Sequence, residues 1–215
     1  PDGHELCLEM PGMHGNYTAT TSIQKSDLLI AIGVRFDDRV TANPSFFAQN
    51  AKVIHADIDP AEIGKVREAQ VPIVGDAKSV ILGLIVALQD EELDTKNWIN
   101  ELNSMKTEHP LSYNQDENGP LKVPFVLEEL QDLTEEGAIV VSGVGQHQMW
   151  ISQHWNFTEP NTWLNSGGLG TMGYSLPAAI GAKTAYPEKL VLALDGDGCF
   201  PVSYTHLTLP TSVIV

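Results

Sequence analysis

The sequence is short of basic residues and of cysteine, and it contains no long apolar run. Only 12 lysines and arginines stand against 28 acidic residues, and the formal net charge of -16 opposes attraction to nucleic acid or to an anionic membrane. No apolar run reaches the roughly 18 residues that a membrane span needs. We therefore expect neither nucleic acid nor membrane as a partner. Anionic ligands must then be held locally, by helix N-termini, single arginines or a divalent metal.

Two cysteines, Cys7 and Cys199, are too few for a disulfide framework or for a zinc site of their own, and their scarcity fits a reducing compartment. The chain starts without methionine, and its first residues have neither the basic nor the apolar part of a signal peptide. We expect an internal piece of a longer protein. Its expected location is the cytoplasm, or an organelle if the source is a plant or a fungus.

Short apolar runs alternate with helical patterns along the 215 residues, which is typical of βαβ units and predicts an α/β fold with parallel sheets. In the first half, strands are predicted over 27–36, 52–59 and 71–76, with helices starting at Asp59-Pro60 and over 77–89 and 94–107. In the second half, helices are predicted over 124–133, from Gln146 and over 175–186, with strands over 138–145 and 189–198. Residues 109–122 lose this periodicity and gather Pro, Asn, Asp and Gly, which indicates a domain boundary.

The last predicted strand runs into Asp195 and then into a Gly-Asp-Gly turn centred on Asp197. An aspartate at the carboxyl end of a parallel strand, flanked by glycines that permit close backbone approach, sits where open α/β sheets bind ligands. A hard cation such as Mg²⁺ takes carboxylate oxygens there and shares a bound diphosphate. The alternative is a plain tight turn, because glycine and aspartate dominate turns.

Other polar loops also follow predicted strands. Gln146 and His147 end one strand, although a lone histidine at a strand end is more often structural than functional. Upstream, residues 33–37 form a strand-to-loop turn whose amides suit a phosphate, and Asp57 is placed to accept from a ribose hydroxyl. The alternative for the charges of residues 35–39 is a solvated cluster of surface salt bridges, which would be worth little.

Six stretches occur in a fixed order along the chain: GMHG (12–15), GVRFDDRVT (33–41), HADIDPAEIGK (55–65), SGVGQHQMW (142–150), SGGLGTMG (166–173) and DGDG (195–198). In this order and spacing the sequence resembles the acetohydroxyacid (acetolactate) synthases, which depend on thiamine diphosphate (ThDP). The resemblance covers residues 1–200. It implies the C-terminal part of a central FAD-binding domain over 1–108, a linker over 109–122, and the N-terminal part of an α/β domain that binds the ThDP diphosphate over 123–200.

The resemblance also implies roles for individual residues. Arg39 matches the arginine that grips the second 2-oxoacid, a role that suits its fixed guanidinium fork. Asp197 matches a metal ligand. Residues implied to line FAD are Pro11, Gly12, Met13, His14, Gly33, Val34, Arg35, Phe36, Asp37, Asp57, Ile58, Asp76 and Ala77. Residues implied to contact ThDP are Gln146, His147, Gly170, Thr171, Met172, Asp197, Gly198 and Cys199, the last replacing the family's usual Ser or Ala.

The implied cofactors are therefore ThDP, Mg²⁺ and FAD, with FAD taking no net redox part. The implied reaction decarboxylates pyruvate and condenses the two-carbon unit with a second 2-oxoacid, pyruvate or 2-oxobutyrate, at the entry to branched-chain amino acid biosynthesis. The implied assembly is a homodimer or larger, with a small regulatory subunit as a further partner. Two alternatives stay open: a non-enzymatic FAD-binding or regulatory remnant, and another ThDP carboligase or decarboxylase.

Parts of that machinery are missing from the sequence. Asp197 is the last Asp, Glu or Asn in the chain, so the family's second metal ligand, an Asn beyond the Gly-Asp-Gly turn, is absent, as is its activating Glu. We expect the piece itself to be inactive. Residues 201–215 have strand-like composition where the fold needs a helix, and we expect them to be a poorly packed, non-native tail.

Overall fold

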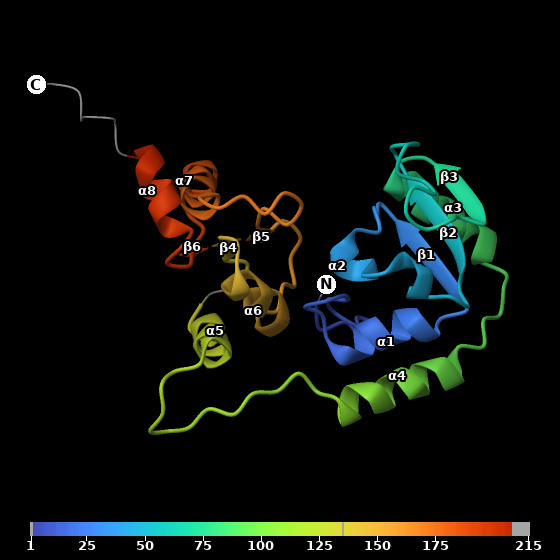
Figure 1. The fold of residues 1–215 in the computed structure, drawn as a ribbon, viewed down its shortest axis with the longest axis horizontal. Coiled ribbons are helices and arrows are strands. Elements are labelled where there is room, and N and C mark those ends of the chain that lie inside the picture. The colour runs from blue at the N-terminus through green and yellow to red at the C-terminus, as the bar shows by residue number, and fades with distance from the viewer. Residues whose placement is uncertain (1, 135, 208–215) are drawn as a thin grey trace, which may run out of the picture. The chain divides into compact units, whose positions relative to one another are not determined.

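The computed structural model describes residues 2–134 and 136–207 and divides the chain into two compact units. One unit comprises Leu8–Leu111, and the other comprises Pro1–Cys7 together with Ser112–Val215. Each contains a parallel sheet of three strands, so the predicted α/β class is confirmed (Figure 1). The division falls inside the predicted boundary 109–122.

The unit of residues 8–111 has strand order β1-β2-β3, formed by Leu28–Ile32, Lys52–Asp57 and Val71–Val74. All three strands are parallel, with Ile30 opposite Ile54 and Ala56 opposite Ile73. On one face Ala31 and Val53 pack with Phe36 and Phe47 in a buried cluster that Ile23 covers. Its helices are α1 (Tyr17–Lys25), α2 (Asp38–Thr41), the short η1 (Pro44–Phe46), α3 (Ala77–Leu88) and α4 (Lys96–Glu108), which lies along α1.

The helix predicted to start at Asp59-Pro60 is wrong, because residues 59–67 form successive turns instead. The predicted cap does form, since Asp59 Oδ1 accepts from the backbone N–H of Ala61 at 2.9 Å. The backbone then makes two isolated hydrogen bonds to the residue three positions earlier, from Glu62 N to Asp59 O and from Lys65 N to Glu62 O, in place of the continuous series of an α-helix. Gly64 adopts φ +74°, a left-handed conformation that ends a helix.

The other unit has strand order β5-β4-β6, formed by Trp163–Leu164, Ile139–Ser142 and Val191–Leu194. All four residues of β4 are buried, and successive side chains of a strand point to opposite faces, so the sheet is covered on both faces. Val140 packs against Leu127 of α5 (Val123–Asp132) and Ile151 of α6 (Gln146–His154). Its neighbours Ile139 and Val141 pack instead against Ala179 of α7 (Ser175–Ala185).

Two segments of this unit join it through contacts that leave no local pattern in the sequence. The two-residue strand β5 is too short to leave a period in the sequence, and it was not predicted. Residues 2–7, which the resemblance assigns to the first domain, also bond to this unit: Asp2 N donates to Phe157 O, and Phe157 N donates to Asp2 Oδ2. Tyr113 anchors the predicted linker by donating its hydroxyl to Glu128 Oε2 at 2.5 Å and meeting the His154 ring edge-on.

The strand-like character expected after Phe200 is wrong for residues 200–207, which form helix α8 (Phe200–Leu207) beside α7 (Figure 1). Pro201 is tolerated because the first-turn amides of a helix have no partner within the helix. Ser203 is buried and Val202 lies over Gly173, so the expected poor packing is also wrong for this turn. Residues 208–215, the rest of the expected non-native tail, lie outside the described residues.

Candidate functional site

Glycine-rich loops leave the carboxyl ends of β4 and β6 side by side. Gly143 N donates to Leu194 O at 3.0 Å, which joins the loop after β4 to the start of the loop after β6. A Cβ on Gly143 would lie 1.9 Å from Asp195 Oδ1, and one on Gly196 would lie 3.0 Å from His147 Cε1. The His147 imidazole is therefore enclosed by backbone that only glycine permits.

Three potential metal ligands meet inside this enclosure. One ligand atom each from His147, Asp195 and Cys199 lies within 4.8 Å of the others, and the His147 Nε2 to Asp195 Oδ1 distance is 3.9 Å. Two hydrogen bonds hold the Asp195 carboxylate in place: its Oδ2 accepts from the buried Ser175 hydroxyl at 2.5 Å, and its Oδ1 accepts from Gly196 N at 3.1 Å. Asp195 and Ser175 were missed as candidate residues, since their contact joins segments distant in sequence.

The electrostatics of His147 follow from its burial. Desolvation lowers the pKa of the imidazole below its ordinary value of 6.5, while the nearby Asp195 carboxylate acts in the opposite direction. Its Nε2 atom is buried and has no hydrogen-bond partner within the described chain. Burial thus favours the neutral imidazole, and its Nε2 lies 3.9 Å from Asp195 Oδ1, which is too far for a hydrogen bond.

The other residues implied to contact ThDP surround the same edge of the sheet. Gly198 lies against Met172, because a Cβ there would be 3.6 Å from Met172 Cε, and Gly170 lies by Val144. Gln146 and Asp197 are both exposed, at the N-terminus of α6 and just before α8. Residues 143–147, 170–172 and 195–199 therefore form one site, which we call the diphosphate edge. No side chain among the described residues caps the N-terminus of α6.

The residues implied to line FAD lie in the unit of residues 8–111, where they follow the strands of its sheet. Gly33, Asp57 with Ile58, and Asp76 with Ala77 come at the carboxyl ends of β1, β2 and β3. Gly33 N donates to Ala56 O and Gly75 N to Asp57 O, so these loops are neighbours. Asp76 caps α3 by accepting from Ser79 N. We call this arrangement the second edge.

Residues 11–14 meet the second edge through the 33–39 loop. Met13 N donates to Arg39 O at 2.8 Å, and a Cβ on Gly12 would lie 2.5 Å from that oxygen. Pro11 and His14 flank this contact in sequence. The 33–39 loop therefore contacts residues 12–13, and its Gly33 bonds the end of β2. The ring of Phe36 is buried beside Phe47 and His55, which leaves only its backbone for a ligand.

The charges of the 33–39 loop form exposed ion pairs. Arg35 pairs with Asp37 at 2.9 Å and Arg39 pairs with Asp38 at 3.1 Å. The Arg39 and Asp38 side chains are 66% and 77% exposed, so this pair adds little to stability. Arg39 is exposed to solvent, which leaves its guanidinium accessible to an anion.

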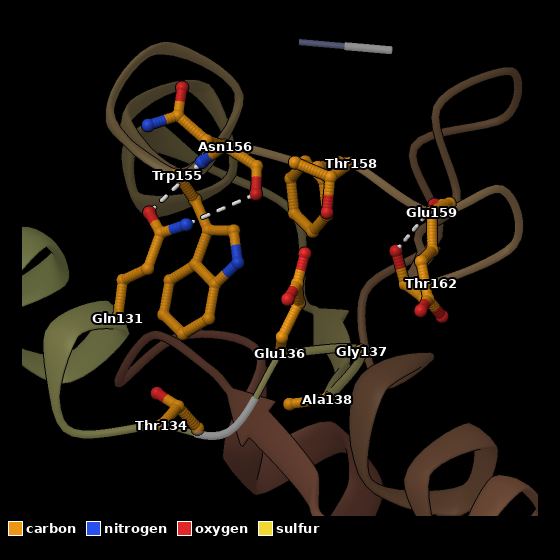
Figure 2. Close-up of a pocket in the computed structure, with 11 residues that line it drawn as sticks. Gln131, Thr134, Glu136, Gly137, Ala138, Trp155, Asn156, Thr158, Glu159 and Thr162 are labelled. Atoms are coloured by element: carbon orange, nitrogen blue, oxygen red, sulfur yellow. Dashed lines mark hydrogen bonds between the residues drawn. The ribbon is translucent and has the colours of Figure 1, made fainter. Parts of the chain in front are cut away.

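A cavity of about 260 Å³ lies at the opposite end of the β5-β4-β6 sheet. It is lined by Ala138, which precedes β4, and Thr162, which precedes β5, together with Trp155 and Phe157 (Figure 2). Its lining residues precede β4 and β5, so the cavity lies at the amino ends of these strands. It is therefore separate from the diphosphate edge, which lies at the carboxyl ends, where ligands of open α/β sheets bind.

Comparison with known proteins identifies one family domain in each half of the chain. Residues 1–84 match the family model for the central domain of thiamine pyrophosphate enzymes, and residues 143–209 match the model for their C-terminal TPP-binding domain. In addition, none of the helices that the structure describes has the length and apolarity of a membrane span.

Similar full-length proteins are acetolactate synthases. The chain is 53% identical to the enzyme of Mycobacterium leprae over 96% of its own length, and 51% identical to the large subunit of Corynebacterium glutamicum over 97%. It is 44% identical to the chloroplastic enzyme of Arabidopsis thaliana over its whole length. It spans 33–34% of the length of these relatives, which is about a third.

Proposed function

Because this chain belongs to the thiamine pyrophosphate enzymes, we propose that its second edge and its diphosphate edge are the FAD and ThDP sites of an acetolactate synthase. The observation that carries the proposal is the convergence of residues 143–147, 170–172 and 195–199 at the carboxyl ends of parallel strands. The reaction proposed for the complete protein is decarboxylation of pyruvate and transfer of the two-carbon unit to pyruvate or 2-oxobutyrate, at the entry to branched-chain amino acid biosynthesis.

The diphosphate edge fits ThDP and Mg²⁺ by the chemistry of its groups. The N-terminus of α6 presents amides that no described side chain caps, and such amides favour phosphate oxygens. Asp197 is exposed and supplies the carboxylate that Mg²⁺ prefers. Gly198 and Gly170 to Met172 would contact the cofactor at the neighbouring loop. When bound, ThDP would supply a carbanion for addition to a 2-oxoacid carbonyl and an electron sink for the electron pair that remains when carbon dioxide leaves.

The second edge fits the adenine nucleotide part of FAD. Gly33 adopts φ +64°, and a Cβ there would meet nothing within 4 Å, so its peptide faces open space at the strand end. Asp57 is half-buried at the end of β2 and suits a ribose hydroxyl. Arg35 and Arg39 supply positive charge near this edge in a chain whose formal net charge is -16.

The chain's own residues would then have separate tasks. His147, whose pKa is lowered by burial, would orient the cofactor by hydrogen bonding through its imidazole without adding charge to the site. Asp197 would hold the cation. Arg39 would hold the carboxylate of the acceptor 2-oxoacid, because a guanidinium fork binds a carboxylate through two parallel hydrogen bonds.

Two further features of the complete protein belong to the proposal. We propose a homodimer or larger assembly, with a regulatory subunit as a partner, because the relative from Corynebacterium glutamicum is named a large subunit. We also propose a cytoplasmic location, or an organellar one as the chloroplastic name of the Arabidopsis relative indicates for that protein.

The test of the ThDP assignment is Asp197→Asn in the protein encoded by the complete reading frame. We expect loss of Mg²⁺-dependent ThDP binding and of acetolactate formation, with flavin content unchanged because the two edges lie in different units. Glu188→Gln is a matched control, since it removes a charge outside both edges. Retained ThDP binding by Asp197→Asn would contradict the assignment, and parallel loss of flavin would mean unfolding.

The test of the acceptor assignment is Arg39→Ala in the same protein. We expect acetolactate output at limiting pyruvate to fall at least about tenfold, because a charge-assisted bidentate pair is lost. Carbon dioxide release should fall less. Lys65→Ala is the control, since Lys65 is also exposed and paired, to Glu62 at 2.7 Å. Equal loss of both activities would contradict a role for Arg39 in acceptor binding.

A further inference from the structure

We propose that His147, Asp195 and Cys199 form a binding site for a thiophilic divalent cation such as Zn²⁺ or Co²⁺. The inference rests on the contacts of these three side chains and not on the proposed function. It differs from the Mg²⁺ assignment, which rests on the exposed Asp197.

The donor set is complete for a three-ligand site. It contains one imidazole nitrogen, one carboxylate oxygen and one sulfur, all within 4.8 Å of one another. Bonds of about 2.0 Å to nitrogen and oxygen and about 2.3 Å to sulfur set tetrahedral ligands roughly 3.3–3.7 Å apart. The 3.9 Å between His147 Nε2 and Asp195 Oδ1 is close to that range, and the three donor atoms lie within 4.8 Å of one another, so the side chains would need to move inward by about 1 Å at most to bind a cation.

Burial and unsatisfied polarity indicate that the space between these groups suits a cation. The Asp195 and His147 side chains are only 9% and 18% exposed, and Cys199 is 2% exposed. His147 Nε2 is buried without a hydrogen-bond partner in the described part of the chain, which costs free energy unless another group meets it. A cation bound at Nε2 would satisfy that lone pair.

The thiol and the carboxylate are already oriented. Cys199 Sγ accepts from Val144 N at 3.3 Å and donates to Val144 O at 2.9 Å. On metal binding the S–H bond breaks, a sulfur–metal bond forms, and the proton leaves to solvent, while the bond from Val144 N remains to support the thiolate. Asp195 keeps its bond from the Ser175 hydroxyl on the oxygen that faces away from His147. Such supporting bonds are typical of protein metal sites.

The experiment is a Co²⁺ titration of the 215-residue chain, without ThDP, followed by absorbance. We expect one equivalent to bind and to produce the near-ultraviolet charge-transfer band of a cobalt–thiolate bond. Cys199→Ser should abolish this band, and His147→Gln should weaken Co²⁺ binding at least about tenfold. Cys7→Ser is the matched control and should retain the band, because Cys7 lies in a different loop, 3.9 Å from Asp2 Oδ1.

A positioning variant separates the site from an unspecific thiol. Ser175→Ala leaves all three ligands in place but removes the bond that orients Asp195, so we expect Co²⁺ affinity to fall about 10- to 100-fold with the same spectrum. Cys199→Ala serves as a second variant, and circular dichroism of each variant checks that the fold is kept. A band that persists in both Cys199 variants, or that disappears in Cys7→Ser, would overturn the proposal, as would the absence of any band in the parent chain.

Discussion

Replacing Gly143 by Ala tests how tightly the loops after β4 and β6 are packed. The new Cβ would lie 1.9 Å from Asp195 Oδ1 and 2.9 Å from His147 Nε2, distances at which one group must move. The backbone of Gly143 is itself fixed, since its N–H bonds Leu194 O at 3.0 Å. Asp195 must therefore leave its place, and with it the bonds from Ser175 and Gly196.

The size of the effect follows from those contacts. Overpacking costs about 1–3 kcal/mol, and a hydrogen bond to a charged group contributes about 1.5–3 kcal/mol. Because the carboxylate regains water when it moves outward, we expect the free energy of unfolding to fall by about 2–4 kcal/mol rather than by the full sum. With a urea slope of about 2 kcal/mol per molar, in the middle of the usual range, the unfolding midpoint should drop by about 1–2 M.

Tryptophan fluorescence during urea unfolding is a suitable assay. Trp150, Trp155 and Trp163 lie in the same unit as Gly143, and Trp163 Nε1 donates to the neighbouring Ser142 hydroxyl at 3.2 Å. Gly181→Ala is the matched control: Gly181 lies within α7, and a Cβ there meets nothing within 4 Å. It should stabilise the chain by up to about 1 kcal/mol through helix propensity. A Gly143→Ala midpoint equal to that of the parent would refute the steric argument.

Three further predictions concern other parts of the chain. Tyr113→Phe should raise the pKa of Glu128 toward its ordinary value of 4.5, because the hydrogen bond from the Tyr113 hydroxyl, and after it the one from His154, holds that pKa down. The lowered pKa contributes stability that is present above pH 4.5 and lost as the pH falls through the lower value, so this contribution should shrink in the variant. NMR titration of Glu128 and acid unfolding would measure the two effects. Gly12→Ala should cost more stability in urea than Gly33→Ala, because both have left-handed φ but only the Cβ at position 12 meets backbone, at 2.5 Å; equal losses would show that conformation alone matters. Val86→Lys should reduce self-association of the chain in analytical ultracentrifugation at nearly unchanged stability, because Val86 is 67% exposed on the apolar helix α3; unchanged association would exclude this face as its cause.

The strands and long helices could be predicted because their signals are local. β4 and β6 lie within continuous apolar runs, and α3 begins where Asp76 can cap its first turn. The same capping logic was wrong at Asp59. A cap stabilises a helix only if the following residues propagate it, and Gly64 turns the chain into the left-handed region after little more than one turn.

Packing explains why α8 was not foreseen. Its Val, Thr and Pro residues favour strand or turn by intrinsic preference, which is a weak bias of a few tenths of a kcal/mol for most residues. In the structure Cys199 and Ser203 are each 2% exposed, so tertiary burial overrides that preference. The contacts that decide the outcome, Val202 over Gly173 and Cys199 on Val144, join segments far apart in sequence and leave no local pattern.

The two aspartates of the last loop show how far sequence reasoning reaches at the diphosphate edge. The sequence singles out Asp197, which lies between two glycines, and the resemblance makes it the metal ligand, whereas Asp195 was not singled out. The structure adds that the two carboxylates have different surroundings: Asp195 is 9% exposed and bound by Ser175, whereas Asp197 is exposed. A hard cation with a diphosphate needs oxygen ligands open to solvent, which Asp197 offers. A thiolate and an imidazole select a softer cation, and both lie within reach of Asp195. If both proposals hold, Mg²⁺ at millimolar concentration should leave the cobalt–thiolate band intact, because the two ions would use different carboxylates.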